Sequence, residues 1–201
     1  LYPVENEHGR FGSFEDFAQV ADWASRWNMG LVPTFPNVQT ADCTPGKGGG
    51  TPTPQEIFMM CWCCVVHKAK GIHWYPYQGK VPPENFAAMT KFVTDTTALT
   101  EAILGEESPV AVKDEELEGG RVDVRATAAN GDLYVFAVNL KRKAEKVRFT
   151  LAKAPAGAKA EVYGEDRSIN LEGASFTDSF DPLDVHVYKI KDAATPARNG
   201  K

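Results

Sequence analysis

The stretch of sequence that decides the fold reads Ala69-Lys70-Gly71-Ile72-His73-Trp74-Tyr75-Pro76-Tyr77. It follows an apolar helical pattern that begins at Thr51-Pro52-Thr53-Pro54-Gln55-Glu56 and ends near Ala69, since proline suits the first turn of a helix. Gly71 then begins a buried strand that brings aromatic rings to its carboxyl end. Barrels of the α/β class carry their active sites at that end, so the pattern indicates a site with aromatic side chains.

The first half of the chain repeats the order strand, helix. We expect strands at residues 1–4, 30–35 and 71–77, and helices at residues 13–28, 54–69 and 83–104. Ser13-Phe14-Glu15-Asp16 fits a capping box, and the apolar face of that helix would be Phe14, Phe17, Val20, Ala21 and Ala24. This alternation predicts parallel strands with helices outside. A barrel needs eight strands, so three strands predict an incomplete one.

After residue 107 the pattern changes to short strands separated by turns. Asn130-Gly131 is a strong type I′ hairpin signal, and residues 132–139 are apolar on both faces, which predicts a central strand. The expected strands are residues 110–113, 121–127, 132–139, 146–151, 159–163, 167–171, 175–180 and 184–190. The predicted fold class is therefore α/β plus all-β, with the last three βα units of a (β/α)8 barrel (1–107), an antiparallel β-sandwich (108–191) and a disordered tail (192–201).

Composition and charge exclude several function classes. The chain has 22 basic and 27 acidic residues, a formal charge of -5, and no basic cluster interleaved with aromatic residues, which argues against a nucleic-acid partner. No apolar run approaches the roughly 20 residues of a membrane span. The cysteines, which are Cys43, Cys61, Cys63 and Cys64, favour buried thiols because no second Cys or His pair lies at metal-ligand spacing. We expect no metal and no cofactor.

Several short segments carry a resemblance over nearly the full chain. They are Tyr2-Pro3, Leu31-Val32-Pro33-Thr34-Phe35 with Gln39, Pro52-Thr53-Pro54-Gln55-Glu56, His67-Lys68-Ala69-Lys70-Gly71-Ile72-His73-Trp74-Tyr75, Asp132-Leu133-Tyr134-Val135-Phe136-Ala137-Val138-Asn139, Phe176-Thr177-Asp178-Ser179-Phe180 and Val185-His186-Val187-Tyr188. In this order the chain resembles the C-terminal part of a bacterial (β/α)8-barrel glycoside hydrolase with a β-sandwich domain after the barrel. The resemblance implies that the strands are the sixth, seventh and eighth of the barrel. It also implies an oligosaccharide or polysaccharide ligand and an extracellular or periplasmic location.

The same resemblance implies two catalytic carboxylates, an acid/base near the end of strand four and a nucleophile near the end of strand seven. Strand four is absent from the sequence, and the end of strand seven, Thr34-Phe35-Pro36-Asn37-Val38-Gln39, has no Glu at the expected place. Asp42 lies too far into the loop to be equated with the nucleophile. Retaining hydrolysis needs two carboxyl groups about 5 Å apart, so we expect the chain alone to be inactive and assign no catalytic residue.

Five residues are candidates for contact with a sugar, each with a structural alternative. Trp74 can stack under a sugar ring or fill the barrel core, and Gln39 can hydrogen-bond a hydroxyl or face only solvent. Tyr77 can reach the rim or pack under the next helix. Glu5 and Glu7 follow a strand end, where this fold carries function, but also fit a solvated acidic loop.

Other ring-bearing residues are expected to be structural. Tyr75 should pack under the following helix, His67 and His73 should have no catalytic role, and His186 should face the outside or the domain interface.

Two functions are compatible with the sequence. The first is a fragment of a glycoside hydrolase that carries part of the sugar-binding cleft. The second is a non-catalytic carbohydrate-binding or structural module, which the missing Glu of strand seven favours. In both cases the sides of the parallel sheet would be bare, so we expect the isolated chain to self-associate or to recruit the missing N-terminal part of the barrel.

Overall fold

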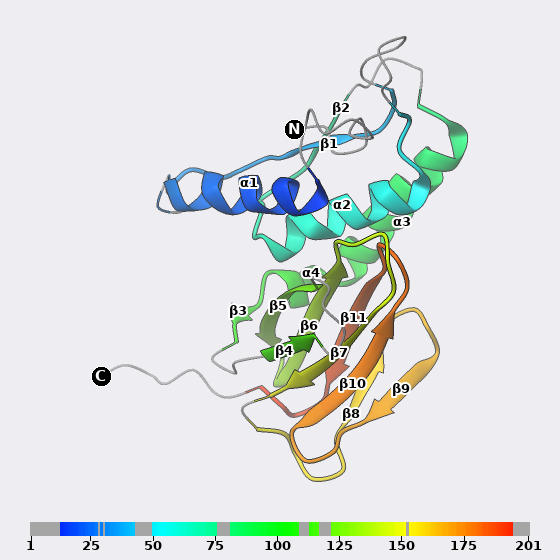
Figure 1. The fold of residues 1–201 in the computed structure, drawn as a ribbon. Coiled ribbons are helices and arrows are strands. Elements are labelled where there is room, and N and C mark those ends of the chain that lie inside the picture. Colours follow the sequence, from blue (N-terminus) through cyan, green and yellow to red (C-terminus); the bar gives the residue numbers. More distant parts are fainter. Residues whose placement is uncertain are drawn as a thin grey trace. The chain divides into compact units, whose positions relative to one another are not determined.

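A computed structural model describes residues 13–27, 29, 31–42, 50–75, 81–108, 113–116, 122–151 and 153–194. The chain forms two compact units, Leu1–Thr97 (the α/β unit) and Ala98–Lys201 (the β unit). Figure 1 traces the order of their elements. The predicted strand at residues 1–4 and the candidates Glu5, Glu7 and Tyr77 lie outside the described residues.

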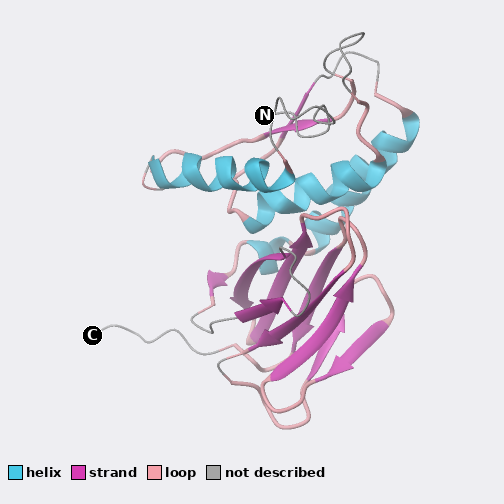
Figure 2. Cartoon of the chain, in the orientation of Figure 1, coloured by secondary structure: helices cyan, strands magenta, loops and turns pink. Residues whose placement is uncertain are grey.

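The α/β unit consists of short parallel strands joined by helices. Its elements are α1 (Phe14–Trp27), β1 (Asn37–Gln39), α2 (Pro54–Val66), β2 (His73–Tyr75) and α3 (Pro83–Ala98). Strands β1 and β2 pair in parallel, and α2 connects them, as the predicted βα order requires (Figure 2). The α/β class predicted for this part of the chain is therefore confirmed.

Capping boxes start both of the first two helices. The Ser13 N–H donates to Asp16 Oδ2 (2.6 Å), and the Asp16 N–H donates to Ser13 Oγ (3.2 Å), as predicted. In α2 the Glu56 N–H donates to Thr53 Oγ1 (3.2 Å), and the Thr53 N–H donates to Glu56 Oε2 (2.7 Å). These bonds satisfy N–H groups that have no partner within a helix, so local sequence sets where each helix begins.

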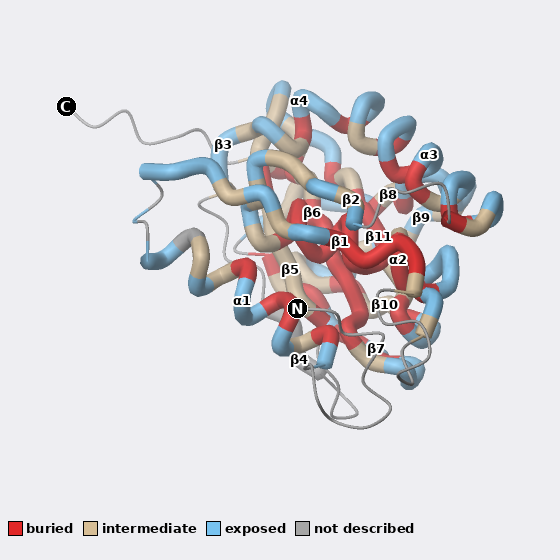
Figure 3. Tube along the Cα trace, turned by 90° about the horizontal axis from the view of Figure 1, so that it is seen from above, coloured by how far each residue is buried: buried red, intermediate tan, exposed pale blue. Residues whose placement is uncertain are grey.

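Helix α2 forms the centre of the α/β unit and is buried along most of its length (Figure 3). Trp62 is 1% exposed and packs edge-on against Phe92 of α3, with ring centroids 5.6 Å apart. Cys61, Cys63 and Cys64 are buried free thiols, and burial raises the pKa of Cys61 to about 12. Burial also raises the pKa of Cys64, so the Cys61 and Cys64 thiols stay protonated. The expectation of buried thiols is confirmed for these three cysteines.

The segment from Leu31 to Phe35 is not the buried strand that its apolar residues predicted. Leu31 is 77% exposed and Phe35 is 59% exposed, and the strand begins later, at Asn37. Pro33 and Pro36 interrupt the segment and have no N–H to donate to a neighbouring strand, so regular pairing starts only after Pro36.

The expected helix from residue 83 to residue 104 is divided. The backbone leaves the helical conformation at Leu99 (φ -99°, ψ 14°), so α3 ends at Ala98 and a short α4 (Thr100–Ile103) follows. The apolar periodicity of this segment places Phe86, Met89, Phe92 and Val93 on its inner face. Met89 and Phe92 are buried there, whereas Phe86 and Val93 are 39% and 47% exposed.

The β unit contains two antiparallel sheets. Its strands are β3 (Glu106–Glu107), β4 (Lys113–Glu116), β5 (Val122–Ala129), β6 (Asp132–Asn139), β7 (Glu145–Thr150), β8 (Lys159–Val162), β9 (Arg167–Asn170), β10 (Ser175–Phe180) and β11 (Val185–Ile190). One sheet has the order β3-β5-β6-β11-β8-β9 and the other β10-β7-β4. The predicted antiparallel architecture is confirmed, and β6 lies centrally between β5 and β11.

Local signals in this unit were accurate. Asn130 (φ 53°) and Gly131 (φ 85°) both adopt positive φ, as a type I′ turn requires, and they connect β5 to β6. Residues from the two sheets share one core, in which Phe149 of β7 stacks on Phe176 of β10 at 4.8 Å and meets Tyr188 of β11 at 5.3 Å.

The start of the tail that we expected to be disordered is packed. Ala193 is 1% exposed and belongs to the β-unit core. The Ala194 N–H donates to the Gly131 carbonyl (3.1 Å), and the Asp192 N–H donates to Asp132 Oδ1 (3.0 Å). The polar composition of the tail did not predict these contacts, because they are made by backbone N–H groups and by one alanine side chain. Residues 195–201 lie outside the described part.

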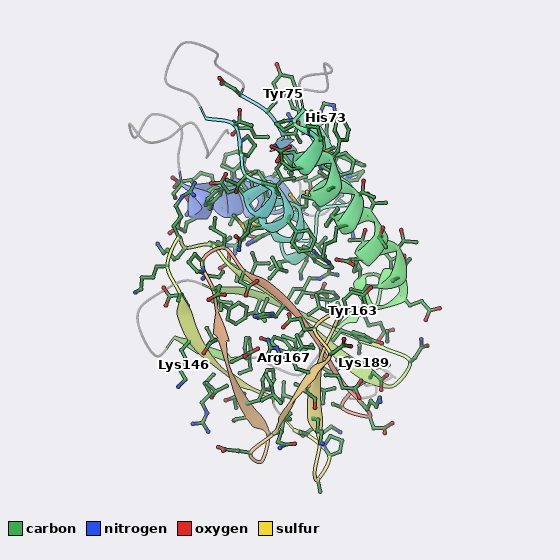
Figure 4. The ribbon with its side chains drawn as sticks, turned by 90° about the vertical axis from the view of Figure 1, so that its right-hand side faces the viewer. His73, Tyr75, Lys146, Tyr163, Arg167 and Lys189 are labelled. Atoms are coloured by element: carbon green, nitrogen blue, oxygen red, sulfur yellow. The ribbon has the colours of Figure 1, made fainter. Side chains whose placement is uncertain are left out.

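A charged cluster, here called the clasp, joins the two sheets at β9, β10 and β11. It consists of Glu165, Arg167, Asp178, Asp184 and His186 (Arg167 is labelled in Figure 4). Arg167 of β9 donates two hydrogen bonds to Asp178 of β10, at 3.0 and 2.8 Å, and one to Glu165 at 2.6 Å. Bidentate pairs of this kind are among the stronger charge-assisted contacts in proteins.

His186 lies inside this clasp rather than on the outside or at a domain interface, so that expectation was wrong. It is 5% exposed, with Nδ1 at 2.5 Å from Glu165 Oε1 and Nε2 at 3.2 Å from Asp184 Oδ2 and 3.5 Å from Arg167 Nη2. The ring of Phe180 covers it at 4.6 Å. The alternation of side chains along β11 could not predict these contacts, because Glu165 and Asp184 lie in turns outside the strand.

The stability of the β unit should depend on pH through His186. Burial would lower the pKa of His186, but the hydrogen bonds and charges of Asp184 and Glu165 outweigh burial and raise it above its usual 6.5. The pKa of Asp184 is lowered, since the contacts from His186 outweigh its burial. Because the pKa of His186 is higher in the folded than in the unfolded state, the protonated ring stabilises the β unit fully below about pH 6.5. This stabilisation is lost as pH rises through the folded-state pKa.

We therefore expect stability, measured as the urea midpoint of the β unit, to fall as pH rises above about 6.5. Asp184 has a lowered pKa, so its contribution to stability is lost in the opposite direction, as pH falls below about 4. His186→Gln should flatten the fall above pH 6.5, whereas Lys146→Ala, an exposed change on β7, should leave it unchanged. An equal slope in the His186 variant would refute the assignment.

Candidate functional site

The carboxyl ends of β1 and β2 form the candidate site. The strands pair in the register Asn37↔His73, Val38↔Trp74 and Gln39↔Tyr75. Because side chains alternate along a strand, Val38 and Trp74 share one face, and the other four residues share the opposite face. We call this second group, Asn37, Gln39, His73 and Tyr75, the strand-end face.

Trp74 lies on the face that meets α2. Its indole N–H donates to Cys61 Sγ of that helix at 3.4 Å, and its neighbour Val38 is fully buried. The Trp74 ring is half-buried against the helix layer. A sugar at the strand-end face would therefore not meet this ring.

Tyr75 lies on the face of β2 opposite Trp74, where it is open to solvent. It is 41% exposed on the strand-end face instead of packed under the next helix, and Figure 4 shows it beside His73 at one end of the α/β unit. The physical reason is the crossing of α2, which covers the opposite face of the sheet. The strand-end face therefore offers an accessible phenol ring.

His73 and Asn37 form a pair on the same face. His73 Nδ1 lies 2.7 Å from Asn37 Oδ1, and both residues are exposed. An amide oxygen only accepts hydrogen bonds, so Nδ1 donates to it, and in the tautomer with this single ring proton Nε2 can accept a hydrogen bond. Sequence reasoning missed Asn37 as a site residue, because the register that places it beside His73 is a tertiary property.

Gln39 is fully buried, and its amide nitrogen holds the loop that follows β1. Nε2 donates to the Ala41 carbonyl at 3.2 Å and to the Gly50 carbonyl at 3.0 Å. Asn85 of α3 acts in parallel, since its Nδ2 donates to the carbonyls of Thr40 (3.2 Å) and Pro52 (2.9 Å). These two amides bring both ends of the loop together at the strand end.

The oxygen Gln39 Oε1 is buried and has no hydrogen-bond partner among the described residues. The alternative that Gln39 faces only solvent is wrong, because the side chain is fully buried. Its contact with a sugar hydroxyl stays a prediction. Asn85 was not predicted at all, because nothing in its own sequence context separates it from other polar residues near a helix start.

Carboxylates are scarce at this edge. Within the described ranges 37–42 and 73–75 the only carboxylate is that of Asp42, which is half-buried in the loop. Among the residues that the structure describes, no cluster of three His, Cys, Asp or Glu side chains could hold a metal ion. In the same part of the chain, none of the helices has the length and apolarity of a membrane span. The described edge thus offers hydrogen-bonding groups and one aromatic ring.

No family model and no curated protein matches the chain. Solved structures do. The α-amylase of Geobacillus thermoleovorans, solved with acarbose, is 13% identical with a TM-score of 0.53, and the match covers 70% of this chain and 34% of that one. An Anoxybacillus α-amylase is 9% identical with a TM-score of 0.56 and coverage of 90% and 46%. A GH27 β-L-arabinopyranosidase of Geobacillus stearothermophilus is 12% identical with a TM-score of 0.56 and coverage of 89% and 41%.

At these identities the likeness concerns the fold. The chain spans less than half the length of these three solved chains. The predicted fold resemblance is confirmed: parallel strands with helices, followed by a six-stranded antiparallel sheet, match part of a glycosidase barrel and the domain after it. The chain has the fold of part of a (β/α)8 glycosidase together with the β-sheet domain that follows the barrel.

Proposed function

We propose that this chain is a non-hydrolysing part of a carbohydrate-active barrel and that its strand-end face contributes contacts to an oligosaccharide. The observation that carries the proposal is Tyr75, an exposed ring beside the His73–Asn37 pair, at the edge where barrels carry their sites. Aromatic faces cover the C–H patches of sugar rings while neighbouring polar groups bind the hydroxyls.

His73, Asn37 and Gln39 offer both donors and acceptors for hydrogen bonds to a sugar. The His73 Nε2 lone pair can accept a hydrogen bond from a hydroxyl, and the amide nitrogen of Asn37 can donate one. Gln39 Oε1 adds a buried acceptor on the same face. Solved matches include a maltose complex and an acarbose complex, which supports glucosides as the first ligands to test.

Hydrolysis is not proposed for the 201 residues alone. A retaining mechanism needs two carboxyl groups about 5 Å apart, and the described strand ends hold only Asp42. This scarcity of carboxylates also favours the second candidate, a carbohydrate-binding module without catalytic function. The two candidates differ in one outcome. A part of a carbohydrate-active barrel should release the aryl group of an aryl glycoside in a longer form of the protein, whereas a binding module should not.

Replacing Tyr75 by alanine should weaken oligosaccharide binding about 2- to 10-fold, the range expected for loss of one aromatic contact. Binding would be measured by saturation-transfer NMR and calorimetry with maltotriose, a galactoside and an arabinoside. Val93→Ala, an exposed apolar change on α3, should leave affinity unchanged. Aryl glycosides should not be hydrolysed by this chain.

Trp74→Phe is a control on the opposite face of β2. It removes the N–H that bonds Cys61 but keeps an aromatic ring on the helix-facing side, so affinity should change little. If Tyr75→Ala binds as well as the wild-type chain, or if no sugar of the panel binds, the strand-end face is not a sugar site.

A further inference from the structure

The turn between β5 and β6 places a chemically reactive pair of residues at the surface of the β unit. Asn130 and Gly131 are both exposed, and both adopt positive φ, at 53° and 85°. Glycine has no side chain to shield its backbone nitrogen, so this nitrogen can approach the carbon of the preceding side-chain amide. The Gly131 N–H has no hydrogen-bond acceptor among the described residues, which leaves its nitrogen available for such an attack.

The side-chain amide of Asn130 is held by α4. Asn130 Nδ2 donates to Glu101 Oε2 at 2.7 Å, although the two residues are 29 positions apart in the sequence. This bond restricts rotation of the Asn130 side chain, whereas the attack requires the amide carbon to come within bonding distance of the Gly131 nitrogen. The contact with Glu101 should therefore slow the reaction.

Helix α4 lies against β5, and side chains of the β5–β6 hairpin hold it there (Figure 1). Thr127 Oγ1 donates to the Ala102 carbonyl at 2.5 Å. Arg125 Nη2 donates to the Ile103 carbonyl at 3.0 Å. These two bonds go to backbone carbonyls, and Thr127 is fully buried. The Asn130 contact, in contrast, joins two exposed side chains, so chemistry at the surface can change it.

We propose that Asn130 is a site of spontaneous deamidation and that the change releases α4 from the β5–β6 hairpin. In the first step the Gly131 nitrogen loses its proton and forms a bond to Asn130 Cγ, while the Cγ–Nδ2 bond breaks and releases ammonia. Water then opens the resulting cyclic imide at one of its two carbonyl carbons. Opening at Cγ gives aspartate, and opening at the backbone carbon gives isoaspartate. The net reaction consumes one water and involves no oxidant or reductant.

Either product removes the N–H donor that Glu101 binds. Aspartate places a second carboxylate beside that of Glu101, and like charges in contact repel each other. Isoaspartate lengthens the backbone of the turn by one carbon, which a two-residue type I′ turn does not accommodate. Helix α4 should therefore loosen from β5, and the change is slow and irreversible. This inference concerns the β unit alone and is independent of sugar binding.

Peptide mass spectrometry of the 201-residue chain, stored at mildly alkaline pH, measures the rate of deamidation at each asparagine. Within the described part of the chain, Asn130 should react first. Glu101→Ala should raise its rate about 2- to 10-fold, the factor that corresponds to one hydrogen bond. Glu101→Gln keeps an acceptor oxygen and should react at nearly the wild-type rate. In urea the two Asn-Gly pairs of the sequence, Asn130-Gly131 and Asn199-Gly200, should react at similar rates, which gives the rate without the restraint of the fold.

The release of α4 has a measurement of its own. Asn130→Asp should increase hydrogen exchange in peptides of residues 99–105 about 2- to 10-fold, because the bond to Glu101 is lost. Asn170→Asp makes the same charge change at an exposed position of β9 and should leave this exchange unchanged. Deamidation of Asn139 or Asn170 before Asn130, or a rate at Asn130 that Glu101→Ala does not alter, would overturn the assignment of the site. Unchanged exchange in Asn130→Asp would overturn the release of the helix.

Discussion

Replacing Phe149 by alanine should lower the free energy of unfolding of the β unit by about 3–5 kcal/mol, the range for removing a buried aromatic ring. Phe149 is fully buried in β7, and its ring touches Phe176, Phe180 and Tyr188 at centroid distances of 4.8, 6.2 and 5.3 Å. Because Tyr188 belongs to the other sheet, the ring holds both sheets of the unit together. Its loss leaves a cavity that rigid strands cannot close.

Hydrogen exchange of peptides from β7 and β10 in the full chain measures this loss for the β unit. All four tryptophans lie before residue 98, so tryptophan fluorescence reports separately on the α/β unit. Lys146→Ala is the matched control, since Lys146 is an exposed residue of the same strand and its replacement should change stability by less than about 0.5 kcal/mol. A loss below about 1 kcal/mol for Phe149→Ala would contradict the packing described here.

Replacing Asp178 by alanine should cost the β unit about 2–4 kcal/mol, less than a fully buried pair because Arg167 is partly exposed. Asp178 accepts two hydrogen bonds from Arg167 and one from the Tyr188 hydroxyl at 2.8 Å. Its removal leaves the guanidinium and a buried hydroxyl without this acceptor, and an unpaired buried group carries a desolvation penalty. The same exchange measurement applies.

A double-mutant cycle with Arg167→Ala separates the pair from its surroundings. If the pair is the main contribution, the double variant should lose little more than Asp178→Ala alone. Additive losses would mean that the two side chains act independently. Asp132→Ala is the control, because Asp132 pairs with Lys189 (2.9 Å) on the other side of β11 and belongs to no part of the clasp.

Much of the fold was predictable from local signals. The capping box at Ser13 placed the start of α1, and Pro54 placed the start of α2. Asn130-Gly131 placed the hairpin, and the strand ranges 132–139 and 175–180 agree with β6 and β10. Each of these signals acts between residues a few positions apart, so the sequence contains the whole interaction. The parallel pairing of β1 and β2 followed from the alternation of strand and helix.

The candidate site was less predictable. A strand with period two offers two faces, and its own residues do not state which face a helix will cover. The sequence left open whether Trp74 stacks under a sugar ring or packs in the core. In the structure α2 crosses on the side of Trp74, and the indole N–H donates to Cys61. Tyr75, His73 and Asn37 were consequently assigned to structural roles or overlooked.

Sequence by itself determined where most helices, strands and turns lie and that a parallel part is followed by an antiparallel part, because hydrogen bonding and side-chain periodicity within a few residues govern those features. Only the tertiary structure decided which side of the β1–β2 pair is open, that Gln39 and Asn85 hold the loop ends, and that His186 lies within carboxylates from two turns. Those contacts join residues up to 45 positions apart, and their energies depend on packing that no local pattern encodes.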